Sequence, residues 1–426
     1  MNIEVEQMLQ ALYGAISEDE QGRWVARLGE LLLRSSFQPI YSFPHRRPVG
    51  YEGLIRVSDA AGQPLSPISA FERVASFDEQ VRLDRLCRLL HVHNFVEQKV
   101  PDCWLFLNIH PAVFVHAASQ AEMLAKAVEV VHQLGLPMQR LVFEVTEDVM
   151  AQDAAFEAAV ESARATGCLL ALDDFGAGHS NFDRIWRIRP EIVKLDRSLL
   201  QRAMGSKRIE RVLMQMVSLL HECGALVLLE GVETRDEAHL ALDADIDLVQ
   251  GYAFGRPQPE LISDGAVSAE LEDIWALFDG RQLLGRTAYQ ERVAPYQSAM
   301  AQALQPLQQG RGLREACDAF LHLPGAQLCY LLDEQGREMG ARVAPLGLEQ
   351  AHDQRFGPLE RAGDARWARR PYFRRAISAP GEVQVTRPYL SLHGARMCVT
   401  VSLAYWQEGR LRVLCGDVGW AQGEPD

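Results

Sequence analysis

Short apolar segments alternate with longer helix-like segments through most of this chain of 426 residues. Two of them, 37–43 and 51–57, are joined by a connection too short for a helix and predict an antiparallel hairpin. Six further segments are separated by helical stretches and are mostly continuous apolar runs, as in parallel strands buried on both faces. They cover 104–109, 141–145, 169–175, 192–196, 226–232 and 248–254. The pattern predicts an α/β fold, a modified TIM barrel in which one strand is antiparallel to the others.

The chain is longer than one barrel needs, since a barrel uses about 250 residues. We expect an N-terminal helical segment over 1–34, the barrel over 35–262, a helical connector over 263–307 and a small α+β unit over 308–426. The last unit has strand-like runs separated by turn sequences such as Asp-Glu-Gln-Gly, which favour an antiparallel sheet.

Charge and cysteine content narrow the function. The net charge of -14 argues against a broad basic surface for a DNA or RNA duplex or for anionic lipid. The first residues lack the pattern of a signal peptide, and no uncharged apolar run reaches the roughly 18 residues that span a bilayer. The eight cysteines are scattered and form no CxxC pair, which indicates reduced, mostly buried thiols. We therefore expect a cytoplasmic protein without a membrane span.

Oxygen-bearing side chains end most of the predicted barrel strands, at the rim where such barrels place their catalytic groups. A single Glu at a strand end is usually only solvated. Several converging carboxylates repel one another unless cations neutralise them. Oxygen ligands without His or Cys favour Mg²⁺ or Mn²⁺ over zinc. The residues concerned are Glu52, Asn108, Glu144, Glu147, Asp173, Asp174, Lys194, Asp196, Glu230, Glu233 and Gln250.

Two adjacent acids, Asp173 and Asp174, pose a geometric question. Neighbouring side chains of a regular strand point to opposite faces, so both acids reach the mouth only if the strand has already ended. The glycines of 176–178 provide that break, either as an ordinary turn or as a mobile lid. His91 and His93 lie in a helical stretch, and we expect them to be core or surface residues rather than ligands.

Eight short motifs, in order along residues 35–262, resemble those of the EAL family of cyclic di-GMP phosphodiesterases. The signature reads Glu52-Gly53-Leu54, with Gly where the family usually has Ala. The other motifs are Gln38-Pro-Ile, Asn108-Ile-His-Pro, Phe143-Glu-Val-Thr-Glu147, Leu172-Asp-Asp-Phe-Gly-Ala-Gly-His-Ser180, Val193-Lys-Leu-Asp196, Leu229-Glu-Gly-Val-Glu-Thr234 and Val249-Gln-Gly-Tyr252.

This resemblance implies hydrolysis of cyclic di-GMP to linear 5′-pGpG with two Mg²⁺ or Mn²⁺ ions. The implied catalytic residues are Lys194, Glu230 and Glu52. The implied metal ligands and their polar neighbours are Glu52, Asn108, Glu144, Asp173, Asp174, Glu230 and Gln250. The implied substrate contacts are Gln38, Leu54 and Arg56, and the implied loop-stabilising residues are Glu147 and Glu233.

The C-terminal unit resembles, more weakly, PAS-like sensor domains of the Cache type. The resemblance is carried by Trp367-Ala-Arg-Arg-Pro-Tyr-Phe373, Arg387-Pro-Tyr389 and Leu414-Cys-Gly-Asp417. It implies a homodimer in which a small ligand of this unit controls the barrel. The implied ligand contacts are Arg370, Tyr372, Tyr389 and Asp417. The alternative is that the aromatic residues belong to the core and that Asp417 is a turn residue.

Two other functions stay open. One is a receptor that binds cyclic di-GMP without hydrolysing it and signals through the C-terminal unit. The other is an unrelated metal-dependent barrel lyase or aldolase, for which no Schiff-base or enolisation constellation stands out. The retention of Glu52, Asp173, Asp174, Lys194 and Glu230 favours catalysis over the receptor.

Overall fold

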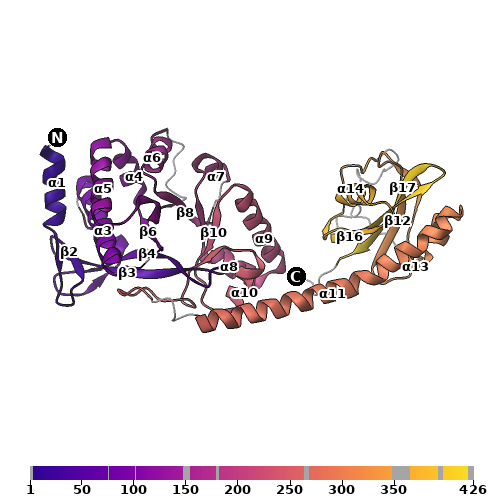
Figure 1. Ribbon diagram of the computed structural model, residues 1–426, viewed down its shortest axis with the longest axis horizontal. Coiled ribbons are helices and arrows are strands. Elements are labelled where there is room, and N and C mark those ends of the chain that lie inside the picture. Colours follow the sequence, from indigo (N-terminus) through magenta and orange to yellow (C-terminus); the bar gives the residue numbers. More distant parts are fainter. Residues whose placement is uncertain are drawn as a thin grey trace. The chain divides into compact units, whose positions relative to one another are not determined.

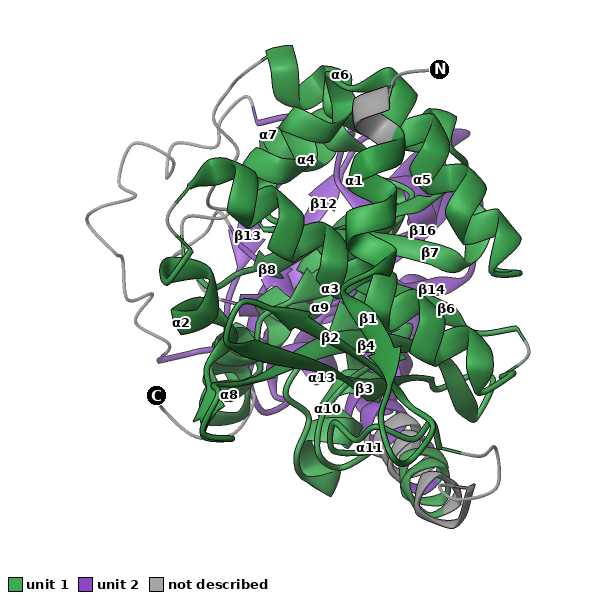
Figure 2. Cartoon of the chain, turned by 90° about the vertical axis from the view of Figure 1, so that its left-hand side faces the viewer, with its two compact units in different colours: residues 1–279 green, residues 280–426 purple. Residues whose placement is uncertain are grey.

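The computed structural model describes residues 3–74, 76–100, 102–146, 154–178, 182–262, 268–347, 365–391 and 397–420. The chain divides into two compact units, Met1–Asp279 (unit 1) and Gly280–Asp426 (unit 2), which Figure 2 colours separately. None of the described helices combines the length and the apolar character that crossing a membrane requires.

Unit 1 contains a closed barrel of eight strands (Figure 1). Strand β3 (Leu31–Ser42) is antiparallel to both of its barrel neighbours, β4 (Arg47–Ser58) and β11 (Leu248–Val249). The remaining neighbours pair in parallel and in chain order. The strands between β4 and β11 are β6 (Trp104–Asn108), β7 (Leu141–Thr146), β8 (Leu169–Phe175), β9 (Ile192–Leu195) and β10 (Leu226–Leu229). The predicted barrel with one antiparallel strand is confirmed.

Helices cover the outside of the barrel, where their apolar faces pack on the outward side chains of the strands. Several begin at a side chain that accepts a hydrogen bond from the first turn, as at Ser76, Asp196, Ser206 and Thr234. The described helices of unit 1 after the first are α2 (Pro67–Glu72), α3 (Phe77–Glu97), α4 (Pro111–Ala118), α5 (Ala121–Gln133), α6 (Ala154–Ala165), α7 (Phe182–Ile188), α8 (Arg197–Gly205), α9 (Lys207–Glu222), α10 (Arg235–Asp243) and the first part of α11 (Ser268–Gln308), with a 3-10 turn at Met138–Arg140.

The N-terminal segment differs from the expected helical segment over 1–34. Only α1 (Ile3–Tyr13) is helical, and it is followed by strands β1 (Ile16–Glu18) and β2 (Trp24–Leu28). Gly29 has φ +58° in the turn between β2 and β3, where Leu28 pairs with Leu31. The leucines at helical spacing therefore belong to a tight hairpin, because a glycine that adopts positive φ favours this turn.

Two layers of side chains fill the barrel interior. The lower layer is apolar and buried, and it consists of Ile40, Val49, Phe106, Val142, Ala171, Ile192, Leu228 and Leu248. Because side chains alternate along a strand, the next inward residue lies two positions further toward the rim. On β4 the two positions are counted from Gly50, because Gly50 is the residue that pairs with Ile40 of the lower layer. On every strand the residue so reached is polar: Gln38, Glu52, Asn108, Glu144, Asp173, Lys194, Glu230 and Gln250. The period of two thus places these eight predicted site residues in one layer, called the polar layer below.

Unit 2 is built on an antiparallel sheet, as its turn sequences predict. The strand order is β13-β12-β17-β16-β14, and β15 also pairs with β16. The strands are β12 (Ala326–Leu332), β13 (Glu338–Val343), β14 (Val383–Val385), β15 (Tyr389–Leu390), β16 (Met397–Gln407) and β17 (Arg410–Gly419). The helices are α12 (Leu313–Ala316), α13 (Asp318–Leu321), α14 (Pro371–Ser378) and the second part of α11 (Ser268–Gln308). The resemblance to PAS-like sensors stays a prediction.

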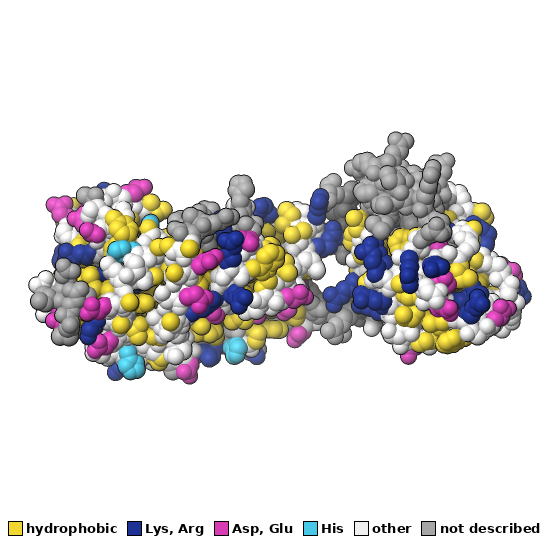
Figure 3. Space-filling view, turned by 90° about the horizontal axis from the view of Figure 1, so that it is seen from above, with side chains coloured by type: hydrophobic (Ala, Val, Ile, Leu, Met, Phe, Trp, Pro, Cys, Tyr) yellow, Lys and Arg dark blue, Asp and Glu magenta, His cyan; other side chains and the backbone are white. Residues whose placement is uncertain are grey.

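The cysteines and the two histidines of α3 lie mostly in the interior. All eight cysteines are free, and all except Cys223 are buried. His91 and His93 are buried as well. Figure 3 shows acidic, basic and apolar side chains interspersed over one face of unit 1.

Candidate active site and metal-binding residues

Lys194 lies at the centre of the polar layer, with only 1% of its surface exposed. Its Nζ is 2.6 Å from Glu144 Oε1, 2.7 Å from Glu230 Oε1 and 3.2 Å from Asp173 Oδ1. Glu52 Oε2 lies further away, at 4.0 Å. Strand β9 places this lysine inside the barrel, so one ammonium group faces carboxylates from four other strands or strand ends.

Two amides orient Glu52. Asn108 Nδ2 donates to Glu52 Oε1 at 2.8 Å, and Gln250 Nε2 donates to Glu52 Oε2 at 2.7 Å. Gln250 Nε2 also lies 3.2 Å from Gln38 Oε1, and Gln38 Nε2 donates to the Gly255 carbonyl at 3.3 Å. Both oxygens of the Glu52 carboxylate are therefore held in fixed directions by neighbouring strands.

The adjacent acids reach the same side by a route that the sequence did not predict. Strand β8 continues through both residues to Phe175, instead of ending before them. Its pairing with β9 shifts register between Leu172 and Phe175, and Asp174 adopts φ +58°. A β-bulge re-aims side chains in this way, and Asp is one of the residues that tolerate positive φ. Asp174 N donates to Asp173 Oδ1 at 3.0 Å.

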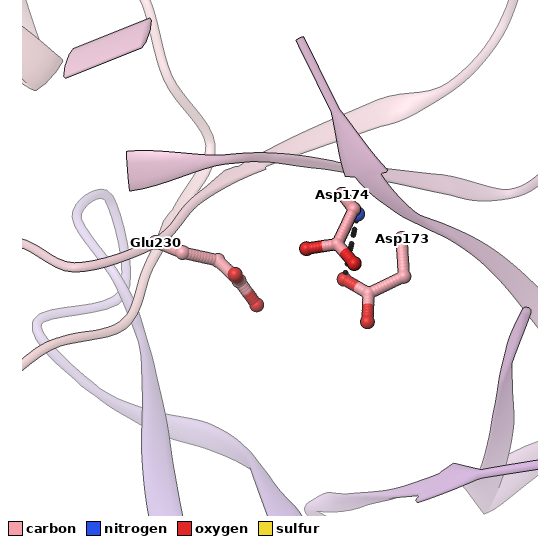
Figure 4. A group of neighbouring side chains, drawn as sticks. All are labelled: Asp173, Asp174 and Glu230. Carbon is pink, nitrogen blue, oxygen red and sulfur yellow. Dashed lines mark hydrogen bonds between the residues drawn. The ribbon is translucent and has the colours of Figure 1, made fainter. Parts of the chain in front are cut away.

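Figure 4 shows the two aspartates of β8 and Glu230, which follows β10, pointing toward a common space. The potential ligand atoms of Asp173, Asp174 and Glu230 all lie within 4.8 Å of one another. Gln250 Oε1 is buried and, within the described part of the chain, has no hydrogen-bond partner. Oxygen donors of this kind suit a hard divalent cation. The arrangement fits metal binding.

Electrostatics favour the same conclusion. Burial raises the pKa of Glu144 well above its ordinary value and raises the pKa of Glu230 to about 7. Burial also opposes the charge of Lys194, but the surrounding carboxylates keep the pKa of its ammonium group well above the usual range. For Glu52, burial is outweighed by Lys194 and the two amides, which lower its pKa. The site thus contains more acidic groups than one lysine neutralises, which favours additional cations.

The other predicted residues lie outside this cluster. Leu54 and Arg56 follow Glu52 on the same face of β4, and Arg56 is exposed at the surface. Glu233 lies after β10, and its Oε1 is 2.8 Å from Arg197 Nη1. Asp196 directly follows β9, as expected, and caps helix α8 by accepting from the Ser198 N–H. Glu147 lies outside the described residues.

Gly53, the unusual residue of the signature, is explained by its packing against helix α3, which sequence reasoning missed. A Cβ at this position would lie 2.9 Å from Cγ of His91. His91 is buried behind the strand, and its Nδ1 is 2.9 Å from Ser35 Oγ. Burial lowers the pKa of His91 to about 3, so the ring is neutral. The glycine makes room for this histidine.

Residues 27–257 match the EAL domain. The chain belongs to the EAL-domain family. Among relatives of known name, this chain is 33% identical over 158 residues to the cyclic di-GMP phosphodiesterase RocR of Pseudomonas aeruginosa, a match that covers 37% of this chain and 39% of RocR. It is 28% identical over 242 residues to the cyclic di-GMP phosphodiesterase PA2567 of the same organism, covering 54% and 39%. The chain therefore spans well under half the length of these relatives.

A solved structure shares the fold over both units. This structure is the EAL-domain protein YkuI of Bacillus subtilis, solved in complex with cyclic di-GMP and calcium. The structural match covers 92% of this chain and 97% of YkuI, with a TM-score of 0.75 and 19% sequence identity. By sequence, the match to YkuI is 24% identical and covers 79% of this chain. The fold outside the EAL domain is thus also shared with a known structure.

The four candidate sensor residues of unit 2 lie near one another. Tyr372 stacks on Tyr389 with ring centroids 6.3 Å apart, and Arg370 Cζ lies 5.8 Å from the Tyr389 ring centroid. Tyr389 Oη is 2.6 Å from Thr400 Oγ1, which donates to Asp417 Oδ1 at 2.6 Å. Asp417 is buried in strand β17, so it is not a turn residue.

Proposed function

We propose that this EAL-domain protein hydrolyses cyclic di-GMP to linear 5′-pGpG with two divalent cations, Mg²⁺ or Mn²⁺. The observation that carries the proposal is the polar layer, in which carboxylates from four strands or strand ends surround Lys194. The names of RocR and PA2567 as cyclic di-GMP phosphodiesterases support the choice of substrate. Its cytoplasmic location stays a prediction.

The layer supplies what phosphodiester hydrolysis needs. Two bound cations lower the pKa of water and neutralise the charge that develops on the phosphoryl oxygens. Asn108 and Gln250 hold Glu52 in one orientation, and the bulge brings Asp173 and Asp174 together. We assign Glu52, Asn108, Glu144, Asp173, Asp174 and Glu230 to metal binding, with Gln250 beside them. Lys194 provides fixed positive charge in a site from which water is largely excluded.

The substrate would enter over the rim, above the polar layer. Leu54 continues the inward face of β4 beyond Glu52, and Arg56 follows it at the surface. A guanidinium at this place suits a phosphate oxygen of the dinucleotide. We therefore keep Gln38, Leu54 and Arg56 as substrate contacts, and Glu147 and Glu233 as residues that stabilise the rim loops.

The test is an assay of the purified chain with cyclic di-GMP and either Mg²⁺ or Mn²⁺. We expect linear 5′-pGpG as the product and loss of turnover in Glu52→Ala and Lys194→Ala. Glu222→Ala and Lys207→Ala are matched controls, because both residues are exposed on helix α9 and lie outside the polar layer. Tight binding without product would instead support a receptor, and neither binding nor turnover would overturn the proposal.

Unit 2 is proposed to act as a PAS-like sensor in a homodimer that controls the barrel. The cluster of Arg370, Tyr372, Tyr389 and Asp417 is the proposed ligand contact. The test compares the full chain with a chain that ends at Leu307. The kinetics of cyclic di-GMP hydrolysis and the molecular mass in solution are measured for both. Unchanged kinetics together with an unchanged oligomeric state would contradict it.

A further inference from the structure

Unit 1 contains an apolar cavity of about 150 Å³ on the outer side of the barrel strands, whereas the polar layer lies inside the barrel. It is lined by helices α1, α3, α4, α5 and α6, which gather on one side of unit 1 in Figures 1 and 2, and by strands β6 and β7. Leu107 and Phe143 form its floor on the strands, and Leu124 and Val131 of α5 form part of its wall. A cavity of this size lined by apolar groups accommodates a benzene-sized molecule.

Two arginines of helix α3, Arg85 and Arg88, line this apolar cavity, and none of its described lining residues is an acid. Arg88 forms an ion pair with Asp84, at 2.5 Å from Nη2 to Oδ2. Arg85 donates from Nη2 to the neutral Gln120 Oε1 at 2.9 Å and approaches Met8 Sδ. Two guanidinium groups therefore share one carboxylate.

The arginines also have unused donor capacity. Arg88 Nε is buried and, within the described residues, makes no hydrogen bond. Burial and the neighbouring Arg88 lower the pKa of Arg85, and Asp84 opposes this shift only in part. A buried donor without a partner is unfavourable, and an anionic ligand would supply the missing acceptor. The cavity thus combines an apolar interior with an excess of one positive charge.

We propose that this cavity is a binding site for a small amphipathic monocarboxylate with an apolar body of about the size of a phenyl ring. The apolar body fills the space between α5 and the strands, where it replaces contacts that the protein itself does not make. The carboxylate faces Arg85 and Arg88, because a guanidinium matches a carboxylate in both charge and geometry. This site is independent of the proposed phosphodiesterase activity.

Calorimetric titration of the full chain with phenylacetate tests the proposal, and phenylacetamide serves as the neutral probe of the same shape. We expect saturable one-to-one binding of phenylacetate and at least about tenfold weaker binding of the amide, since hydrogen bonds to charged groups contribute more than neutral ones. Absence of saturable phenylacetate binding at millimolar concentration, or equal affinity for acid and amide, would overturn the proposal. Neither comparison depends on a variant that folds.

Variants then locate the site. Arg85→Met should weaken phenylacetate binding at least about tenfold, whereas Arg82→Met, an exposed arginine of the same helix outside the cavity, should leave it within about twofold. Ala127→Phe places a ring at the cavity wall and should abolish binding, whereas Ala125→Phe on the same helix should not. Binding that is the same in Arg85→Met and Ala127→Phe as in the parent chain would show that phenylacetate binds elsewhere.

Discussion

Unit 1 and unit 2 both bury carboxyl groups, but they compensate them in opposite ways. In the barrel, Glu52, Glu144, Asp173 and Glu230 surround one lysine, and the acids still outnumber the cation. In the sheet of unit 2, Asp417 is buried without an ion pair among the described residues and accepts a hydrogen bond from Thr400.

The difference shows two solutions to the cost of burying charge. A carboxyl group in an apolar place either acquires a cation or shifts its pKa until it is neutral. In the barrel, Lys194 and the two amides lower the pKa of Glu52, although burial still raises the pKa of Glu230 to about 7. In unit 2, where no described cation pairs with Asp417, burial raises its pKa to about 6. Several acids around one lysine fit the proposed metal binding, whereas a single acid among hydroxyl groups is a group that titrates by itself.

Removing the lysine should break this contrast most strongly. We expect Lys194→Met to destabilise metal-free unit 1 by about 3–5 kcal/mol at neutral pH, because it leaves buried carboxylates without their cation. Hydrogen exchange of the peptides from β9 and β10, followed by mass spectrometry in the presence of a chelator, measures the local free energy of opening. The loss of stability in Lys194→Met should be smaller at pH 5, where the carboxyl groups are more readily protonated.

The control for this prediction is Lys207→Met, since that lysine is exposed on α9. It should change stability by no more than about 0.5 kcal/mol. Equal protection of β9 in Lys194→Met and in the parent chain would mean that the carboxyl groups are already neutral without the lysine.

Asp417 should make the stability of unit 2 depend on pH. Its folded pKa is raised from 3.8 to about 6, so between these values the unfolded chain loses its proton first. The contribution of Asp417 to stability is therefore greatest below about pH 4 and is lost as pH rises through about 6, by about 3 kcal/mol in total. Hydrogen exchange of peptides from β16 and β17, corrected for the intrinsic effect of pH on exchange, measures this slope of stability against pH.

In Asp417→Asn this fall in stability should disappear, because the side chain no longer titrates. Tyr389→Phe keeps the acid and removes one hydroxyl from the chain of hydrogen bonds, so it should keep the slope. A variant Asp417→Asn that retains the full slope would assign the titration to another group.

The polar layer was predictable from the sequence because it depends only on strand periodicity. A polar residue two positions after an inward apolar residue must lie one layer higher, whatever the rest of the fold does. The bulge at Asp174 and the space that Gly53 leaves for His91 depend on contacts between distant segments, so no local pattern reveals them. The helical expectation for residues near Leu31 failed for a related reason, because the pairing of β3 with β2 and β4 outweighs the spacing of three leucines.

An amide beside the proposed metal ligands should have a smaller effect than the lysine. Gln250→Leu removes the donor to Glu52 Oε2 and should weaken Mn²⁺ binding by about 10–100-fold, as is typical when a partner of a metal ligand is lost. Calorimetric titration with Mn²⁺ measures the affinity. Gln133→Leu, at an exposed position of α5, is the matched control. If both variants bound Mn²⁺ within about twofold of the affinity of the parent chain, Glu52 would not need the hydrogen bond from Gln250.

The smallest effect is expected at the rim, where solvent weakens charge interactions. Glu233 pairs with Arg197 at 2.8 Å, with 33% and 43% of the two side chains exposed. Such pairs contribute about 0–1 kcal/mol, so Glu233→Gln should lower kcat by no more than about fivefold. The difference from the parent chain should also shrink in about 0.5 M salt, because ions screen exposed pairs. If kcat instead fell by more than about a hundredfold, and salt did not change this loss, Glu233 would belong with the buried acids around Lys194. The boundary between the charged interior and the solvated rim would then lie one residue layer further out.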